Sequence, residues 1–513
     1  PFNEVTLDAV FTGPDGVEQT VPAFWSGGQT WRVRFAARQP GSYRLRTICS
    51  DASNRDLHSR QETVEAVPYC GSNPLLAHGF PRVAPDQRHL EYADGAPFFW
   101  MADTWWMGLV KRLPWPGGFQ ELAADRVAKG FTVIQIVAGL YPDMGPFDER
   151  GANEAGFPWK QDFSCINPDY FEMADARLGH LVRSGLMPCI VGQWGYFMDF
   201  AGLDVLKKHW RNIIARYGAY PVAWCTAGEA MMPYYLVENF PHESEEATAR
   251  KRAGWTELVR TIREIDSYRH PVTIAFGLDQ VDDISLLDMY MIGGSHSGYS
   301  GLAAPADNLL KGLEQEPRRP CYIGETHYEG ISESCREEMQ RFVFWSCMLS
   351  GAMGHTYGAN GIWQVNSREA PFGPSPHGSA WGNLPWEDAY RLPGSEQLGI
   401  SKRLLEQFPW WRLESHPEWV EPHNTPEDRL APYAAGVPGE WRLVYLPPMS
   451  SRLARQGQLA LAALEPGRSY RTRLFDPKTG DSRDLGTVSG DAEGRWRVPT
   501  LPVFQDFVLI LES

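Results

Sequence analysis

The chain contains two short apolar runs that both end in Gly-Glu: Val222-Ala-Trp-Cys-Thr-Ala-Gly-Glu229 and Pro320-Cys-Tyr-Ile-Gly-Glu325. A run of this length bounded by turn residues is typical of a strand buried on both faces, and the glycine allows the chain to leave the strand sharply. Each run therefore predicts a buried strand whose C-terminal end presents one carboxylate. In a (β/α)8 barrel, such positions point into the mouth.

The spacing of the two runs suits a barrel. Their glutamates are 96 positions apart (325 minus 229), which leaves room for two strand-helix units between them, so we expect strands 4 and 7. Eight strand candidates are Pro97 to Ala102, Thr132 to Val137, Met187 to Val191, Val222 to Thr226, Pro271 to Phe276, Met289 to Ile292, Cys321 to Gly324 and Ala352 to Tyr357. Helix candidates between them include Gly118 to Lys129, Pro168 to Ser184, Leu206 to Tyr217, Thr248 to Asp266 and Ser332 to Ser350. Alternating strands and helices predict a TIM barrel with long top loops, one of them at 140–166.

Both ends of the chain show a different periodicity. Apolar and polar residues alternate in short pieces, such as Trp31 to Phe35 and Trp441 to Leu446, with turn residues between them. This pattern predicts antiparallel sandwiches. We therefore expect a β-sandwich at 1–85, the (β/α)8 barrel at 86–411 and a small β-sandwich at 412–513.

The length and net charge of the chain exclude some classes of partner. A chain of 513 residues is too long for one core, and its net charge of −15 argues against nucleic acid or an anionic membrane as partner. No apolar run is long enough to span a membrane. A neutral partner such as a sugar fits this charge better.

The eight cysteines predict free thiols rather than disulfides, since Cys189, Cys225 and Cys321 lie within the apolar runs. No spacing of cysteines and histidines suggests a metal site, and we expect no cofactor. Buried thiols favour a cytoplasmic location. The chain starts at Pro1 without a signal-like segment, so we expect a trimmed N-terminus, and a periplasmic or secreted location stays open.

The chain contains the motifs Phe24 to Phe35 with Gln39 to Tyr43, Ala102-Asp-Thr-Trp-Trp106, Gly324-Glu-Thr-His-Tyr-Glu-Gly330 and Leu474 to Gly480. With these motifs it resembles the apiosidase-like glycoside hydrolases, family 140 and its relatives. The resemblance spans nearly the whole chain and implies a clan A barrel between two β-domains. The chain departs from the family pattern at the strand 4 acid position, where it carries Glu229 and related enzymes can carry Asp.

Clan A resemblance implies that Glu229 is the acid/base and Glu325 the nucleophile. The resemblance implies a separation of about 5 Å between the two carboxyl groups, and this separation predicts retention of anomeric configuration. Glu329 competes with Glu325 for the nucleophile role, although a loop-anchoring role suits its position past the strand end. Trp224 and Met231 are candidates to desolvate Glu229, and His296 is a candidate to hydrogen-bond Glu325.

Other residues at strand ends are candidate sugar contacts. Asp103 can accept hydrogen bonds from hydroxyl groups or form a salt bridge instead. Tryptophan rings stack on the C–H faces of sugars, or they pack in the core. The candidates for binding are Asp103, Trp105, Trp106, Gln193, Trp194, His296, His355, Tyr357 and Trp363.

The leading hypothesis is a retaining glycoside hydrolase that removes a terminal sugar from a plant or bacterial glycan. The resemblance alone implies apiose or another pentofuranose. Two alternatives stay open: a carbohydrate-binding barrel without catalysis, and a transglycosylase that uses the same glutamates. The oligomeric state is not predicted.

Overall fold

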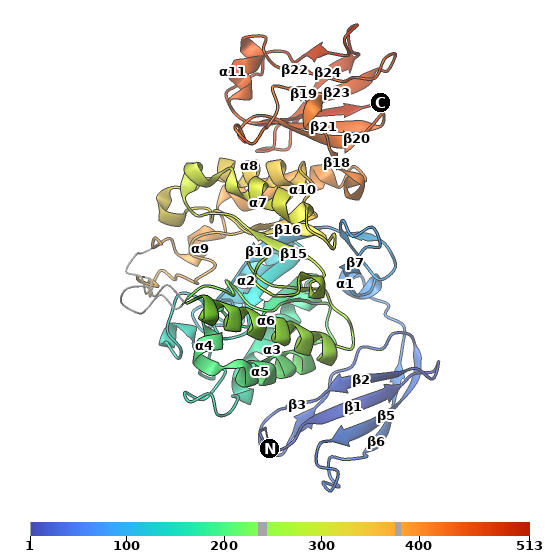
Figure 1. Cartoon of the computed structure of the whole chain (residues 1–513), viewed down its shortest axis with the longest axis vertical. Helices are drawn as coiled ribbons and strands as arrows, with labels where there is room; N and C mark the ends of the chain where they lie inside the picture. Colours follow the sequence, from blue (N-terminus) through green and yellow to red (C-terminus); the bar gives the residue numbers. More distant parts are fainter. Residues whose placement is uncertain (1, 234–243, 375–380) are drawn as a thin grey trace.

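The computed structural model describes residues 2–233, 244–374 and 381–513. Figure 1 shows three parts along the long axis: the N-terminal strands at one end, a barrel in the middle and the C-terminal strands at the other end. The fold predicted from the sequence, a TIM barrel between two β-domains, is confirmed.

The barrel is an eight-stranded parallel sheet in the order β14-β13-β12-β11-β10-β17-β16-β15. Its strands are β10 (Trp100–Thr104), β11 (Val133–Val137), β12 (Met187–Val191), β13 (Ala223–Cys225), β14 (Val272–Thr273), β15 (Tyr290–Gly293), β16 (Cys321–Glu325) and β17 (Gly354–Tyr357). Each overlaps a predicted run, with β10 extending two residues past its run and β15 and β16 one residue each. Strands β13 and β16 are the fourth and seventh barrel strands along the chain. The first run is divided, because β9 (Pro97–Phe98) belongs to a small antiparallel sheet with β8 (Leu90–Glu91) and β7 (Arg82–Val83).

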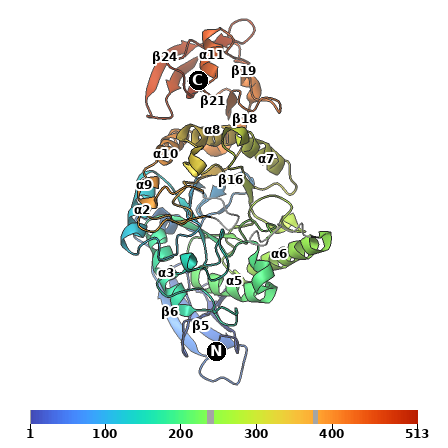
Figure 2. The same cartoon turned by 90° about the vertical axis from the view of Figure 1, so that its left-hand side faces the viewer.

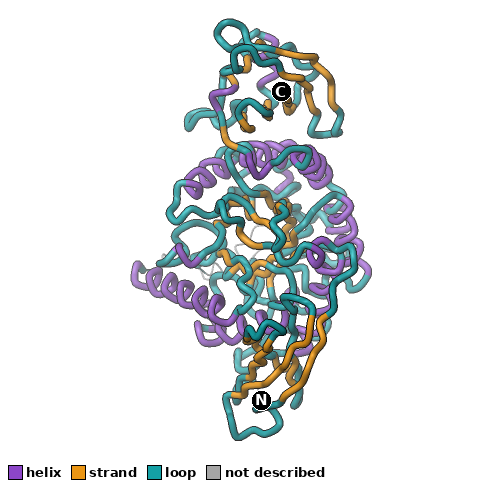
Figure 3. Tube along the Cα trace, turned by 90° about the vertical axis from the view of Figure 1, so that its right-hand side faces the viewer, coloured by secondary structure: helices purple, strands orange, loops and turns teal. Residues whose placement is uncertain are grey.

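Helices cover the outside of the barrel, as Figures 2 and 3 show. Their bounds are α2 (Gly117–Ala128), α3 (Pro168–Arg183), α4 (Phe197–Ala201), α5 (Leu203–Tyr217), α6 (Glu245–Ile265), α7 (Ala304–Leu313), α8 (Glu337–Met348), α9 (Trp386–Ala389) and α10 (Pro393–Leu405). The helix predicted from Ser332 begins only at Glu337. Left-handed backbone at Gly330 (φ 82°) and Ser332 (φ 48°) prevents an earlier start.

The N-terminal part is a four-stranded antiparallel sheet with a short hairpin beside it. The sheet contains β1 (Leu7–Thr12), β2 (Glu18–Pro22), β5 (Gly41–Cys49) and β6 (Gln61–Ala66), and the hairpin joins β3 (Phe24–Trp25) to β4 (Trp31–Arg32). Strands β2 and β3 contact α5. The short helix α1 (Pro74–Ala77) follows in the connection to the barrel.

The C-terminal part is a sandwich of six and three strands. The larger sheet contains β18 (Glu414–Ser415), β20 (Tyr433–Val437), β21 (Trp441–Leu446), β26 (Phe507–Glu512), β23 (Tyr470–Phe475) and β24 (Ser482–Val488). The smaller contains β19 (Val420–Glu421), β22 (Ala460–Leu461) and β25 (Trp496–Arg497), and α11 (Ser450–Arg455) lies between β21 and β22 in sequence.

One face of the larger sheet joins the hydrophobic core of the barrel. Tyr445 lies against Phe342 and Trp345 of α8, with ring centroids 6.1 and 6.2 Å apart. A buried ion pair between Arg341 and Asp506 (2.7 Å) adds to this contact. The barrel and the C-terminal sheet therefore share one core.

Among the described residues, no helix has the length and apolar character needed to cross a bilayer. All eight cysteines are free thiols.

Candidate active site

A cavity of about 290 Å³ opens where the barrel strands end. Both predicted glutamates line it, Glu325 as the last residue of β16 and Glu229 in the loop after β13. The described lining residues are Trp106, Pro142, Asp143, Trp194, Glu229, Met232, His296, Glu325, Tyr328, Ile331, Trp363 and Trp381.

Close packing, rather than a turn, explains the glycine before each glutamate. A Cβ at Gly228 would lie 2.2 Å from the ring of Trp194, and a Cβ at Gly324 would lie 2.2 Å from Cγ of Met291. Neither glycine has a positive φ, whereas Glu229 itself has φ 38°. A non-glycine residue in this region is strained, and such strain gathers at functional sites.

Glu229 is partly buried and lies in a negatively charged environment. Nε1 of Trp194 donates a hydrogen bond to its Oε2 at 2.9 Å. Burial, followed by the negative charge of Glu325, raises the pKa of Glu229 to about 7, and the Trp194 bond acts in the opposite direction. Glu229 therefore retains a proton to near neutral pH. Trp224, expected to desolvate Glu229, is not among the described lining residues, and its Nε1 donates to Asp266 at 2.9 Å.

Glu325 accepts hydrogen bonds on a single oxygen. The hydroxyl of Tyr328 donates to Oε1, and Nε2 of His296 lies 3.3 Å from the same atom, as expected for His296. Nε1 of Trp106 donates to the hydroxyl of Tyr328 at 2.7 Å. Burial and the charge of Glu325 raise the pKa of Tyr328 well above its usual value, so its hydroxyl stays a donor. These donors hold the carboxylate of Glu325 in position.

Aromatic rings form much of the cavity wall. Trp106, Trp194 and Trp363 were among the sequence candidates, and Trp363 stacks on Tyr328 with centroids 5.8 Å apart. Sequence reasoning missed Tyr328 as a cavity residue, although it lies only three positions after Glu325. It also missed Asp143 and Trp381, which lie in long loops without a periodic signal.

Five of the predicted sugar contacts lie outside the cavity lining and are fully buried: Asp103, Trp105, Gln193, His355 and Tyr357. The structure corrects this expectation, because most of these groups bind other parts of the protein. Asp103 pairs with Arg126 at 2.6 Å and accepts from Trp105 at 2.7 Å, which is the salt-bridge alternative. Nε2 of Gln193 donates to the carbonyl of Thr226 at 2.7 Å. All five side chains are enclosed by protein.

Glu329 also lies outside the cavity lining. Its carboxylate accepts hydrogen bonds from the hydroxyl of Tyr357 at 2.6 Å and from the backbone N–H of Gly394 in the first turn of α10. Burial raises the pKa of Glu329 to about 7. These contacts match the loop-anchoring role expected for Glu329.

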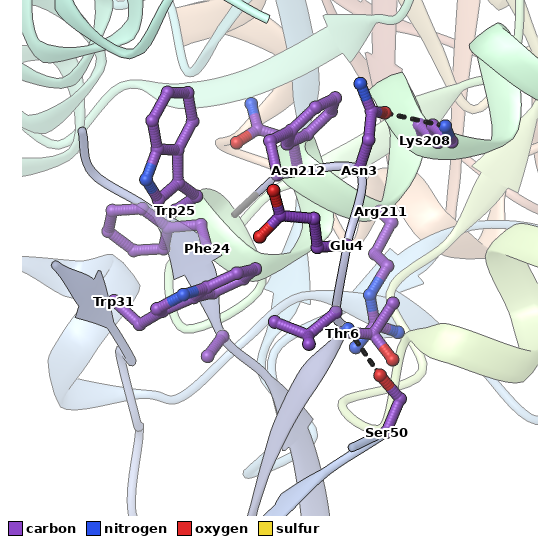
Figure 4. A pocket seen from close by; sticks show the side chains of 13 residues that line it. Asn3, Glu4, Thr6, Phe24, Trp25, Trp31, Ser50, Lys208, Arg211 and Asn212 are labelled. Atoms are coloured by element: carbon purple, nitrogen blue, oxygen red, sulfur yellow. Dashed lines mark hydrogen bonds between the residues drawn. The ribbon is translucent and has the colours of Figure 1, made fainter. Parts of the chain in front are cut away.

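A second cavity, of about 200 Å³, lies between the N-terminal hairpin and α5 (Figure 4). Trp25 and Trp31 of the hairpin and Arg211 of α5 are among its lining residues, and Glu4 is the one carboxylate there among the described residues. A single carboxylate does not provide the pair that glycoside hydrolysis uses. The barrel cavity is therefore the candidate active site.

Within the described ranges, no group of three or more His, Cys, Asp or Glu side chains is arranged to hold a metal ion.

Residues 84–412 match the family described as "Apiosidase-like, catalytic domain", and residues 1–50 match a domain of unknown function. No curated protein matches the chain.

Solved structures support the fold. One titled "Glycoside hydrolase" is 20% identical with a TM-score of 0.67, covering 86% of this chain and 98% of its own. A family 5 glycoside hydrolase from Bacteroides vulgatus is 19% identical with a TM-score of 0.68, covering 86% and 95%. A putative glycoside hydrolase from the same organism is 17% identical with a TM-score of 0.67, covering 100% and 96%. At these identities the similarity shows the fold alone.

Proposed function

The chain belongs to the apiosidase-like catalytic domain family, and from this membership we propose that it is a retaining glycoside hydrolase that removes a terminal sugar from a glycan or glycoside. A pentofuranose such as apiose is the first sugar to test, because the family resemblance implies it.

The observation that carries the proposal is the different environment of the two cavity glutamates. Glu229 has a pKa raised to about 7, so it still holds a proton near neutral pH. Glu325 accepts hydrogen bonds on Oε1 from Tyr328 and His296, which hold its carboxylate in position. Glycosidases need one carboxylic acid to protonate the leaving oxygen and a second carboxylate to attack the anomeric carbon or to activate water.

In the proposed reaction, Oε2 or Oε1 of Glu325 attacks the anomeric carbon while Glu229 donates its proton to the glycosidic oxygen. The bond to the leaving group breaks, and a covalent glycosyl ester forms on Glu325. Glu229, now ionised, removes a proton from water, which attacks the same carbon. The sugar leaves with retained configuration, and Glu325 becomes a free carboxylate again.

This mechanism makes a geometric prediction. The carboxyl groups of Glu229 and Glu325 are expected about 5 Å apart, which a crystal structure with a bound sugar would measure. A separation beyond about 8 Å would indicate inversion, because it leaves room for a water between sugar and base.

Replacement of each glutamate tests the roles. Glu325→Gln should abolish turnover of every substrate, because no covalent intermediate forms. Glu229→Ala should still turn over nitrophenyl glycosides, whose leaving group needs no proton. Added azide should then speed this variant and give a glycosyl azide of retained configuration, identified by NMR. An azide product of inverted configuration from Glu229→Ala would mean that the two roles are exchanged.

A further inference from the structure

The second cavity, of about 200 Å³, has two tryptophan rings in its wall. Trp25 of β3 and Trp31 of β4 are partners in the antiparallel pairing of the hairpin. Residues directly opposite each other in such a pair project from the same face of the sheet, so the two indole rings belong to one surface. Figure 4 shows both side chains at the cavity. The hairpin therefore offers an aromatic surface on which the face of a ligand ring can stack.

Hydrogen bonds hold the hairpin in place. Nε1 of Trp25 donates to the carbonyl of Gly28, in the turn between the two strands, at 2.9 Å. The hydroxyl of Ser26 and a guanidinium N–H of Arg32 donate to Oε1 of Glu172 on α3, at 3.0 and 3.2 Å. The aromatic surface is thus fixed to the barrel before a ligand arrives, which reduces the entropy that binding costs.

The N-terminal segment forms another wall of the second cavity. Asn3 donates from Nδ2 to the carbonyl of Ser164 at 2.7 Å and accepts at Oδ1 from Nζ of Lys208 at 2.8 Å. The ring of Phe2 packs edge-on against Trp159, with centroids 5.7 Å apart. Ser164 and Trp159 belong to the long loop after β11, and other residues of this loop line the catalytic cavity. The second cavity is therefore a built site at the interface of two domains, where ligand pockets often occur.

Polar groups from both domains complete the lining. Asn212 on α5 is 6% exposed, and its Oδ1 accepts from Nε of Arg216 at 3.4 Å. Its Nδ2 has no hydrogen-bond partner among the described residues. Thr6 and Ser50 contribute hydroxyl groups. A buried N–H without a partner is costly, so a ligand oxygen beside Asn212 is favoured.

This mixture of groups favours a sugar over an ion or an apolar molecule. The lining contains charged side chains of both signs, Lys208 and Arg211 with Glu4, and Arg211 is paired with Asp8 at 2.6 Å. A single charge on a ligand is therefore not strongly selected. An apolar ligand would leave the amide of Asn212 without a partner. A sugar has C–H faces that suit the rings and hydroxyl groups that both donate and accept.

We propose that the second cavity is a carbohydrate-binding site that takes one sugar residue of a glycan and performs no catalysis. The C–H face of the sugar stacks on Trp25 and Trp31, and its hydroxyl groups bind Asn212 and Thr6. Residues 1–50, which match a domain of unknown function, supply most of the described lining. The site binds sugar whether or not the barrel hydrolyses it.

The test measures glycan binding by the full chain with Glu325→Gln, so that turnover in the barrel does not remove the glycan. An array of plant and bacterial oligosaccharides is read with this protein and with the same protein carrying Trp31→Leu. Leucine removes the ring and keeps an apolar side chain, so at least one oligosaccharide should bind about tenfold more weakly, as calorimetry measures. Trp31→Tyr keeps a ring face and should bind that oligosaccharide within about threefold of the parent protein.

Trp496→Leu in the same background is the matched control. Trp496 is a half-buried tryptophan of β25 and is not among the described lining residues of either cavity. Its array pattern and affinities should equal those of the parent protein. A pattern that Trp31→Leu leaves unchanged, or no binding by the parent protein, would overturn the proposal. An equal loss in Trp31→Tyr and Trp31→Leu would also overturn it, because stacking would then not be the cause.

A crystal structure decides the case in which Trp31→Leu does not fold. Glu325→Gln with its tightest array oligosaccharide should show a sugar ring against Trp25 and Trp31, and a second cavity without sugar would reject the site. Absence of hydrolysis by the wild type would reject the proposed hydrolase and leave this binding site standing.

Discussion

Trp194 donates its indole N–H to Oε2 of Glu229 at 2.9 Å, and this bond opposes the burial and charge that raise the pKa of Glu229 to about 7. Trp194→Phe should therefore raise that pKa further. The acid then keeps its proton to higher pH, and the basic limb of kcat/KM should move up by roughly one pH unit. The measurement is the pH dependence of kcat/KM on an unactivated glycoside.

Trp363→Phe is the matched control for this shift, since it alters another tryptophan of the same wall, and the Nε1 of Trp363 has no hydrogen-bond partner among the described residues. Its basic limb should stay at the wild-type pH even where KM changes. A downward shift in Trp194→Phe would contradict the assignment of Glu229 as the acid.

Tyr328→Phe removes the hydroxyl that donates to Glu325 and is itself held by Trp106. The nucleophile loses a donor that orients its carboxylate, so formation of the covalent intermediate should slow roughly 10- to 100-fold. Pre-steady-state release of nitrophenol measures this step. An unchanged burst rate would show that the hydroxyl does not position the nucleophile.

Asp103→Asn should reduce stability and leave substrate affinity unchanged. The carboxylate and its partner Arg126 are both fully buried, and loss of one member of such a pair costs about 3 to 5 kcal/mol. The midpoint of urea unfolding should fall clearly, while KM of the folded enzyme stays at the wild-type value. Asp388→Asn, in an exposed pair with Arg368, is the control and should shift the midpoint little. A selective rise in KM for Asp103→Asn would restore the sugar-contact hypothesis.

Glu329→Gln should also reduce the stability of the protein rather than its catalytic rate. It weakens the bonds to Tyr357 and to the N–H of Gly394, at a cost of roughly 1 to 3 kcal/mol. The melting temperature should fall, and kcat/KM per folded molecule should remain near wild type. If this variant proved as inactive as Glu325→Gln while fully folded, the nucleophile assignment would be wrong.

The barrel could be predicted from the sequence because its strands are buried on both faces. Runs such as Met187 to Val191 are continuous apolar segments between turn residues, and this run is β12 without a shift at either end. The helix expected from Ser332 starts only at Glu337, since the backbone of Ser332 is left-handed (φ 48°). Periodicity reports which residues are apolar and does not report φ.

The site could be predicted only in part, for a related reason. The Gly-Glu ends of two runs identified Glu229 and Glu325 as cavity residues. The position of Asp103 at a strand end did not reveal that Arg126, 23 residues later on α2, turns inward to meet it. Asp143 and Trp381 lie in irregular loops 238 positions apart, and only the folded chain brings them within 3.2 Å.

The shared core between α8 and the C-terminal sheet has a consequence for synthesis of the protein. Strand β26 pairs with both β21 and β23, so it is the centre of that sheet, yet the ribosome makes it after every other strand of the sheet. Until Phe507–Glu512 emerges, the apolar surface of α8 around Phe342 and Trp345 lacks its cover, and Arg341 lacks Asp506. The nascent barrel is thus exposed to aggregation from the synthesis of α8 until β26 emerges, and chaperone binding should be strongest in this interval.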